Sequence, residues 1–249
     1  MLSSVDFIFI IHFKMERKII FATSILSSDF SKLKEEIEKC EDAGADRIHL
    51  DVMDGHFVPN LTFGPIVVES IRKTTSLPLD VHLMIERPEN YINDFINAGV
   101  NLIAFHVEEY PGKNSPAPVD GVYPRTTIDM NEEKLRETIR KIKSKGVKVS
   151  LALNPPTDFF AGNLADELDE VLIMTVNPGW GGQVLISSTL KKIKDIRSKF
   201  SKDIKVDGGM NESTIREIKD AGANVFIIGS YFFHSENPKE SLKKLRNLL

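Results

Sequence analysis

The chain changes from helix to strand at Asp42–Leu50, which reads DAGADRIHL. Similar segments, NAGVNLIAF and DAGANVFII, occupy positions 97–105 and 220–228. In each, a glycine follows an amphipathic stretch and precedes an apolar run, which is typical of a helix C-terminus that leads into a buried strand. Repeated joins of this kind predict parallel strands linked by helical crossovers.

Eight apolar, β-branched runs alternate with helical stretches along the chain. The predicted strands are Ile19–Ser24, Arg47–Asp51, Leu79–His82, Leu102–His106, Lys148–Leu153, Glu170–Val176, Ile204–Asp207 and Val225–Ile228. The predicted helices are Asp29–Ala43, Pro65–Thr74, Pro88–Ala98, Asn131–Lys145, Thr157–Leu168 (the weakest pattern), Ser187–Phe200, Asn211–Ala221 and Pro238–Leu248. This alternation predicts an α/β fold, a single-domain (β/α)8 TIM barrel. The first helix opens without a Gly-x-Gly-x-x-Gly motif, which weakens the dinucleotide-binding alternative.

Two segments do not fit the regular alternation. Residues 1–17 are expected to form an N-terminal extension outside the core, and 18–249 are expected to form the barrel domain, which would also be the catalytic domain if the chain is an enzyme. The apolar run at 5–13 is far shorter than the roughly 20 residues of a membrane span, and it lacks the features of a signal peptide. Residues 107–130 carry four prolines and no periodicity. Such a long loop is either a functional rim or lid, or a plain surface insertion.

The composition excludes several classes of function. The 249 residues are 41% hydrophobic and carry a net charge of −4, which argues against binding to nucleic acid or an anionic membrane. Cys40 is the only cysteine, so no internal disulfide can form. A free thiol fits a reducing cytoplasm, and Cys40 is expected to be buried and inert.

The predicted strand ends bring together residues that bind metals. His49 and Asp51 share one face of the second strand, His82 ends the third and Asp207 ends the seventh. In a barrel of this type the active site lies at the C-terminal ends of the strands. Two histidines and two carboxylates suit one divalent ion such as Zn²⁺, Mn²⁺, Fe²⁺ or Co²⁺, and the donor atoms do not choose among them.

Glycine-containing turns follow three successive late strands. They are found in NPGWGG at 177–182, at Gly208-Gly209 and in Gly229-Ser230. Glycine lets backbone N–H groups approach an anion closely, and the loops after the seventh and eighth strands commonly bind phosphate in this fold. The substrate is therefore expected to be a small phosphorylated molecule.

These motifs resemble those of the ribulose-phosphate 3-epimerase family. The matching segments run in order from about residue 18 to the end. They are Ser24–Ser27, His49–Asn60, Asp80–Met84, Met174–Gln183, Val206–Gly209 and Gly229-Ser230. The resemblance implies an enzyme that interconverts D-ribulose 5-phosphate and D-xylulose 5-phosphate by two-base proton transfer at C3 through an enediolate.

The resemblance also implies the roles of individual residues. The metal ligands would be His49, Asp51, His82 and Asp207, with Asp51 as proton acceptor and Asp207 as donor. The substrate and phosphate contacts would come from Ser24, His82, Gly179, Trp180, Gly181, Gly182, Gly208, Gly209, Gly229 and Ser230. The wall of the site would be formed by Met53, Met84 and Met174, for which simple core filling is an equal alternative. A homo-oligomer is implied as well.

Some features depart from the family pattern. Trp180 stands where the family usually has phenylalanine, and Tyr231 replaces a small residue, so it is expected to crowd the phosphate end. His106 and Glu108 match the end of the family's fourth strand and are expected to support the site rather than bind the metal.

Three alternative functions stay open: an epimerase of a six-carbon ketose phosphate such as D-allulose 6-phosphate, a non-catalytic sugar-phosphate-binding barrel and a metal-dependent aldolase. The paired acids Asp51 and Asp207 argue against simple binding. A Schiff-base aldolase is disfavoured because Lys148 and Lys205 lie near strand starts, at the opposite end of the barrel.

Overall fold

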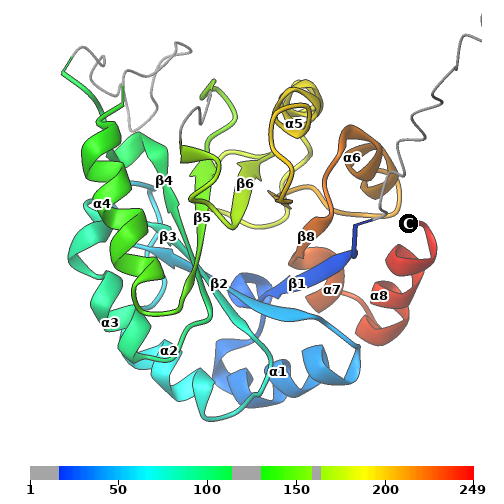
Figure 1. Cartoon of the computed structure of the whole chain (residues 1–249). Helices are drawn as coiled ribbons and strands as arrows, with labels where there is room; N and C mark the ends of the chain where they lie inside the picture. The colour runs from blue at the N-terminus through cyan, green and yellow to red at the C-terminus, as the bar shows by residue number, and fades with distance from the viewer. Residues whose placement is uncertain (1–16, 114–129, 159–163) are drawn as a thin grey trace, which may run out of the picture.

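The fold is a closed barrel of eight parallel strands that pair in chain order, with β8 returning to β1 (Figure 1). The computed structural model describes residues 17–113, 130–158 and 164–249, so the extension at 1–16 and most of the long loop lie outside it. The strands are β1 Ile20–Ser24, β2 Arg47–Met53, β3 Leu79–Met84, β4 Leu102–His106, β5 Lys148–Leu153, β6 Glu170–Met174, β7 Asp203–Asp207 and β8 Val225–Ile228. The predicted TIM barrel is thereby confirmed.

Helices surround the strands on the outside of the barrel (Figure 1). The α-helices are α1 Leu33–Asp42, α2 Pro65–Arg72, α3 Ile92–Asn97, α4 Glu132–Lys143, α5 Thr189–Arg197, α6 Ile215–Ala221, α7 Ser230–Phe233 and α8 Pro238–Asn247. Short 3-10 helices are η1 Ile25–Ser27, η2 Phe30–Lys32, η3 Pro88–Asn90 and η4 Val107–Glu109. None of the helices in the described part of the chain is long and apolar enough to cross a membrane.

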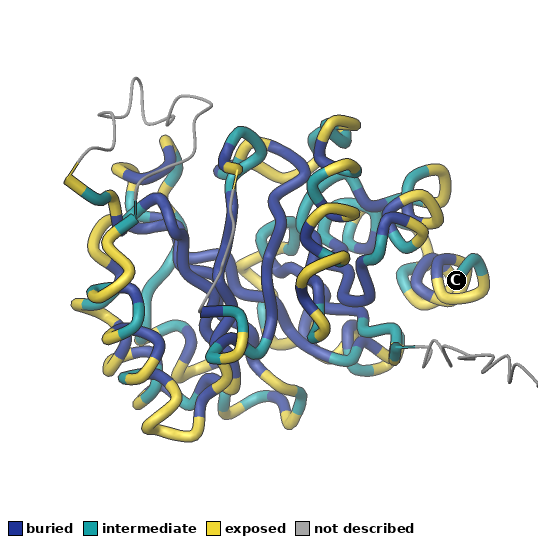
Figure 2. The backbone as a smooth tube through the Cα atoms, turned by 45° about the horizontal axis from the view of Figure 1, so that its top comes forward, coloured by how far each residue is buried: buried dark blue, intermediate teal, exposed yellow. Residues whose placement is uncertain are grey.

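The helices form because their apolar residues repeat at helical spacing. In α4, Leu135, Ile139 and Ile142 are buried against the barrel, and the Asn131 side chain caps the helix by accepting a hydrogen bond from the Lys134 N–H. Figure 2 shows the result as buried strands inside and helices with exposed outer faces. The main core lies between strands and helices, and a smaller apolar cluster fills the barrel interior.

Several predicted helices are shorter than their apolar pattern suggested. The predicted helix Pro88–Ala98 divides into η3 and α3, after a left-handed residue at Arg87 (φ 47°). The predicted helix Asn211–Ala221 begins only at Ile215, because the Asn211 and Thr214 side chains bond to nearby backbone N–H groups and favour a turn.

The predicted helix Thr157–Leu168 was wrong over its described residues. Thr157 and Asp158 are not helical, and a turn occupies 164–167. Residues 159–163 lie outside the described part. The Thr157 hydroxyl instead donates to the Glu108 carboxylate, which holds the chain in an irregular conformation at this point.

Candidate active site

Three strands bring the four predicted metal ligands together at the C-terminal mouth of the barrel. Asp51 on β2 is in register with His82 on β3, and His49 lies one pleat earlier. One potential ligand atom from each of His49, Asp51, His82 and Asp207 lies within 4.8 Å of the others. The structure thus brings together all four residues.

His49 is buried between two carboxylates. Its Nε2 lies 3.3 Å from Asp51 Oδ1 and its Nδ1 3.3 Å from Asp80 Oδ2. Neither nitrogen has a partner with hydrogen-bond geometry among the described residues. Burial acts to lower the pKa of His49, but Asp51 and Asp80 outweigh it and raise the pKa to about 10. The pocket therefore favours a cation at His49, and a divalent ion can replace the extra proton.

Asp51 is the hub of the cluster. Its Oδ1 lies 3.2 Å from His82 Nδ1, and its Oδ2 accepts a hydrogen bond from the Ser24 hydroxyl at 2.5 Å. Burial acts to raise the pKa of Asp51, but the interactions with His49 and His82 lower it by a larger amount. The carboxyl group is therefore ionised. His49 Nε2 and His82 Nδ1 both lie close enough to Asp51 Oδ1 for these three residues to bind one ion. The donor set therefore fits a divalent metal.

His82 and Asp207 complete the cluster. Burial lowers the pKa of His82 to about 3, so its imidazole is neutral, as a metal ligand must be. Asp207 is the most open of the four, with 18% of its side chain exposed, and its Oδ2 lies 3.9 Å from His82 Nδ1. Its pKa is raised to about 7 by burial and by Asp51.

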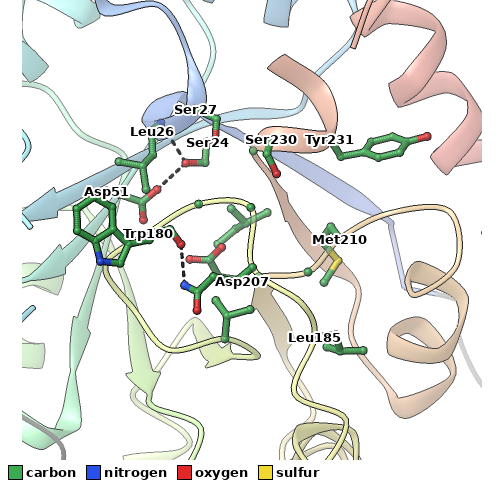
Figure 3. A pocket seen from close by; sticks show the side chains of 18 of the residues that line it. Ser24, Leu26, Ser27, Asp51, Trp180, Leu185, Asp207, Met210, Ser230 and Tyr231 are labelled. Atoms are coloured by element: carbon green, nitrogen blue, oxygen red, sulfur yellow. Dashed lines mark hydrogen bonds between the residues drawn. The ribbon is translucent and has the colours of Figure 1, made fainter. Parts of the chain in front are cut away.

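A cavity of about 580 Å³ opens above this cluster (Figure 3). It is lined by the predicted substrate contacts Ser24, Gly179, Trp180, Gly181, Gly182, Gly208, Gly209, Gly229 and Ser230, and by Asp51 and Asp207. The three predicted wall residues, Met53, Met84 and Met174, also line it. His82 lies beneath and does not line the cavity, although it was expected among the substrate contacts. The cavity is thus lined by the carboxylates Asp51 and Asp207 and by glycine-containing loops.

Two loops at the mouth are held in defined conformations. Gly209 has φ 69°, and a Cβ there would lie 2.7 Å from the Leu185 backbone nitrogen, so only glycine fits. The Asn60 side chain donates to the Gly179 carbonyl at 2.7 Å and so joins the loops after β2 and β6. Tyr231, which was expected to crowd the phosphate end, lines the cavity beside Ser230, and in Figure 3 its ring points away from Asp51 and Asp207. Its hydroxyl donates to Glu212.

A layer of buried charges beneath the metal cluster was missed by the sequence reasoning. Lys205 Nζ contacts both oxygens of Asp80 at 2.6 and 2.7 Å and lies 3.5 Å from Glu170. Arg47 Nη1 lies 2.6 Å from Glu170 and 3.9 Å from Asp80. We call Arg47, Asp80, Glu170 and Lys205 the charged ring.

Strand alternation gives only a partial signal for the charged ring, because it shows which face a side chain shares but not which distant residues meet. Asp80 shares a face with His82, and Lys205 shares one with Asp207. Lys205 is fully buried rather than merely near a strand start. Its amine is held by two carboxylates, so the chain offers no free amine here for a Schiff base.

Comparison with known sequences identifies the relatives of this chain. The sequence pattern of the ribulose-phosphate 3 epimerase family matches residues 20–116 and 126–233. The chain belongs to this epimerase family. The ribulose-phosphate 3-epimerase of Bacillus subtilis (strain 168) is 44% identical over 232 residues, which cover 90% of this chain and 97% of that relative. The chloroplastic ribulose-5-phosphate-3-epimerase of Arabidopsis thaliana is 42% identical, over 92% and 76% of the two chains.

Two solved structures are similar to this chain in fold alone. A 3-hexulose-6-phosphate synthase superposes with a TM-score of 0.63 at 15% identity, over 93% of this chain and 100% of the other. A mutant tryptophan synthase alpha-subunit from Pyrococcus furiosus gives 0.60 at 14% identity, over 93% and 97%. Epimerase membership therefore rests on sequence, and these structures add support for the TIM barrel.

Proposed function

We propose that this chain interconverts D-ribulose 5-phosphate and D-xylulose 5-phosphate with one bound divalent metal. The observation that carries the proposal is the position of Asp51 and Asp207. They come from strands that are not neighbours, β2 and β7, and both line the cavity and belong to the four-residue cluster. Relatives named as epimerases of this sugar phosphate are about 40% identical over most of the chain.

Epimerisation at C3 needs two acid–base groups on opposite faces of the sugar. The carbon lies next to the ketone, so loss of its proton gives an enediolate, and return of a proton to the other face inverts the centre. In our proposal Asp51 removes the proton and Asp207 delivers the second one. The Ser24 hydroxyl holds the Asp51 carboxylate in place through the 2.5 Å hydrogen bond. The reverse reaction exchanges the two roles.

The remaining cavity residues bind and enclose the substrate. We assign the phosphate to the N–H groups of Gly208, Gly209, Gly229 and Ser230, because backbone donors suit an anion. Met53, Met84 and Met174 supply an apolar wall that excludes water from a planar intermediate.

His49, Asp51, His82 and Asp207 would hold the metal. When bound, the ion would supply Lewis-acid stabilisation of the charge that develops on the sugar oxygens. Two nitrogen and two carboxylate ligands suit Zn²⁺, Mn²⁺, Fe²⁺ or Co²⁺. We further propose a homo-oligomer, to be tested by light scattering, and a cytoplasmic location, which the buried free thiol of Cys40 supports.

Turnover by the purified, metal-loaded protein tests the proposal. D-ribulose 5-phosphate and D-allulose 6-phosphate are compared, and we expect conversion of the five-carbon substrate. Preference for the six-carbon substrate would keep the mechanism and change the substrate. Conversion of neither substrate by the metal-loaded protein would favour the binding-only alternative.

Substitution of each acid tests the two-base assignment. Asp51→Asn should reduce turnover by at least about 10²–10⁴-fold, the usual contribution of a general base. Asp207→Asn should stop net epimerisation while still exchanging the C3 proton of one epimer with solvent. Asp169→Asn is the matched control, because Asp169 lies outside the cavity in contact with Lys143. Substantial turnover by the Asp51 variant would remove this residue from the mechanism.

A further inference from the structure

The end of β4 carries a buried histidine that touches the metal cluster without belonging to it. His106 Nε2 lies 2.9 Å from His82 Nε2, and the two rings are stacked with centroids 5.0 Å apart. Both imidazoles are fully buried. Of two nitrogens this close together, one must carry the hydrogen and the other must accept it. The direction of this hydrogen bond decides whether His82 Nδ1, which faces Asp51, carries a hydrogen or a lone pair.

Glu108 sets that direction. Its Oε2 lies 3.0 Å from His106 Nδ1, and an ionised carboxylate can only accept. The hydrogen of a neutral His106 is therefore on Nδ1, and its Nε2 accepts from the N–H of His82 Nε2. His82 Nδ1 then carries no hydrogen, and a cation bound by it and by Asp51 Oδ1, 3.2 Å away, would satisfy both lone pairs. This is the nitrogen that the metal cluster needs.

Glu108 is held rigidly as an ionised acceptor. Its Oε1 accepts from the Asn154 backbone N–H at 2.7 Å and from the Thr157 hydroxyl at 2.5 Å. Burial acts to raise the pKa of Glu108, but the hydrogen bonds from His106, Thr157 and Asn154 outweigh burial and lower it. The irregular β5–β6 connection therefore supports the site, because its Asn154 N–H and Thr157 hydroxyl hold the Glu108 carboxylate in place.

We propose that His106 and Glu108 are positioning residues that fix His82 in the tautomer with Nδ1 free for the metal. His49 is arranged differently, since Asp80 faces its outer nitrogen directly. The proposal rests on the metal site proposed above. It predicts that hydrogen-bond partners outside the ligand set control metal affinity, as is general for histidine ligands.

The test measures metal binding by the apoprotein and needs no turnover. Co²⁺ affinity is obtained by competition with a chelator, and the visible spectrum of the Co²⁺ form reports its ligand geometry. His106→Phe removes the acceptor for His82 and should weaken Co²⁺ binding by about 10–100-fold and shift the spectrum. His106→Gln restores an acceptor and should recover most of the affinity. Glu108→Gln, which weakens the anchor of His106, should fall between them.

The control variant is Tyr110→Phe. Tyr110 follows Glu108 closely in the chain and is equally buried, but its hydroxyl contacts Thr138, away from the cluster. Its Co²⁺ affinity should equal that of the wild type. Thermal unfolding of each apoprotein separates loss of folding from loss of affinity.

Nitrogen-15 NMR of the wild-type protein loaded with Zn²⁺, which is diamagnetic, tests the tautomer directly and depends on no variant. A hydrogen on His82 Nε2 is expected, and a hydrogen on Nδ1 of neutral His82 would overturn the proposal. Wild-type affinity in a folded His106→Phe protein would overturn it too. Failure of the wild type to bind Co²⁺ would instead refute the metal site itself.

Discussion

Replacement of Lys205 by methionine should destabilise the barrel strongly while leaving its shape intact. Lys205 is fully buried and donates to both oxygens of Asp80. The charged ring holds two positive and two negative side chains, so removing Lys205 leaves one carboxylate uncompensated. Loss of one partner of a buried ion pair typically costs about 3–5 kcal/mol of unfolding free energy. For a chain of this size that corresponds to a fall in Tm of roughly 6–20 °C.

The assay is thermal unfolding of the apoprotein, followed by circular dichroism. Lys148→Met is the control, because Lys148 also lies on a strand but is exposed. Its Tm should change by only a few degrees. A Tm for Lys205→Met equal to that of Lys148→Met would refute the argument that loss of a buried charge from the charged ring lowers the free energy of unfolding.

A double variant tests the electrostatic cause. Adding Asp80→Asn to Lys205→Met removes the uncompensated carboxylate, so the double variant should be less destabilised than the sum of the two single variants. Strict additivity would mean that lost packing, rather than unpaired charge, explains the Lys205 effect.

Three further outcomes are expected. Gly209→Ala should raise the KM for the sugar phosphate and lose about 1–3 kcal/mol of stability, because it adds a clash to a strained φ; Gly44→Ala, with φ 79° and open space, should lose stability without a change in KM. Cys40 should not react with Ellman's reagent at pH 8 until the protein unfolds, because burial raises its pKa to about 12 and so keeps the thiol protonated; rapid labelling of the folded protein would contradict this. Asn60→Ala removes the hydrogen bond to Gly179 and should raise KM while costing only about 1 kcal/mol of stability; an unchanged KM would show that the loops are held independently.

The sequence predicted the strands and the cluster because both depend on short-range patterns. A buried strand needs an apolar run wherever it lies, and His49, Asp51 and His82 are placed by the alternation of side chains. Asp207 could be placed in the same cluster because the parallel strands of a barrel all end at one mouth. The cysteine was also predicted correctly, since Cys40 is fully buried.

The charged ring and several helix starts needed information that local patterns lack. Asp80 and Lys205 are 125 positions apart, and their contact depends on the depth that each strand reaches in the barrel. Asn211 looked like the start of a helix, but the turn formed by its side chain could be judged only with the surrounding loop in place.

The strands carry the proton-transfer candidates Asp51 and Asp207, whereas the rim that faces the rest of the substrate is built from loops. This division lets selection, natural or in the laboratory, act on the two parts separately. Exchange of the 177–184 loop would change the lining of the cavity but not the strands that carry the two carboxylates. The rim can therefore be redesigned by loop grafting while Asp51 and Asp207 keep their places.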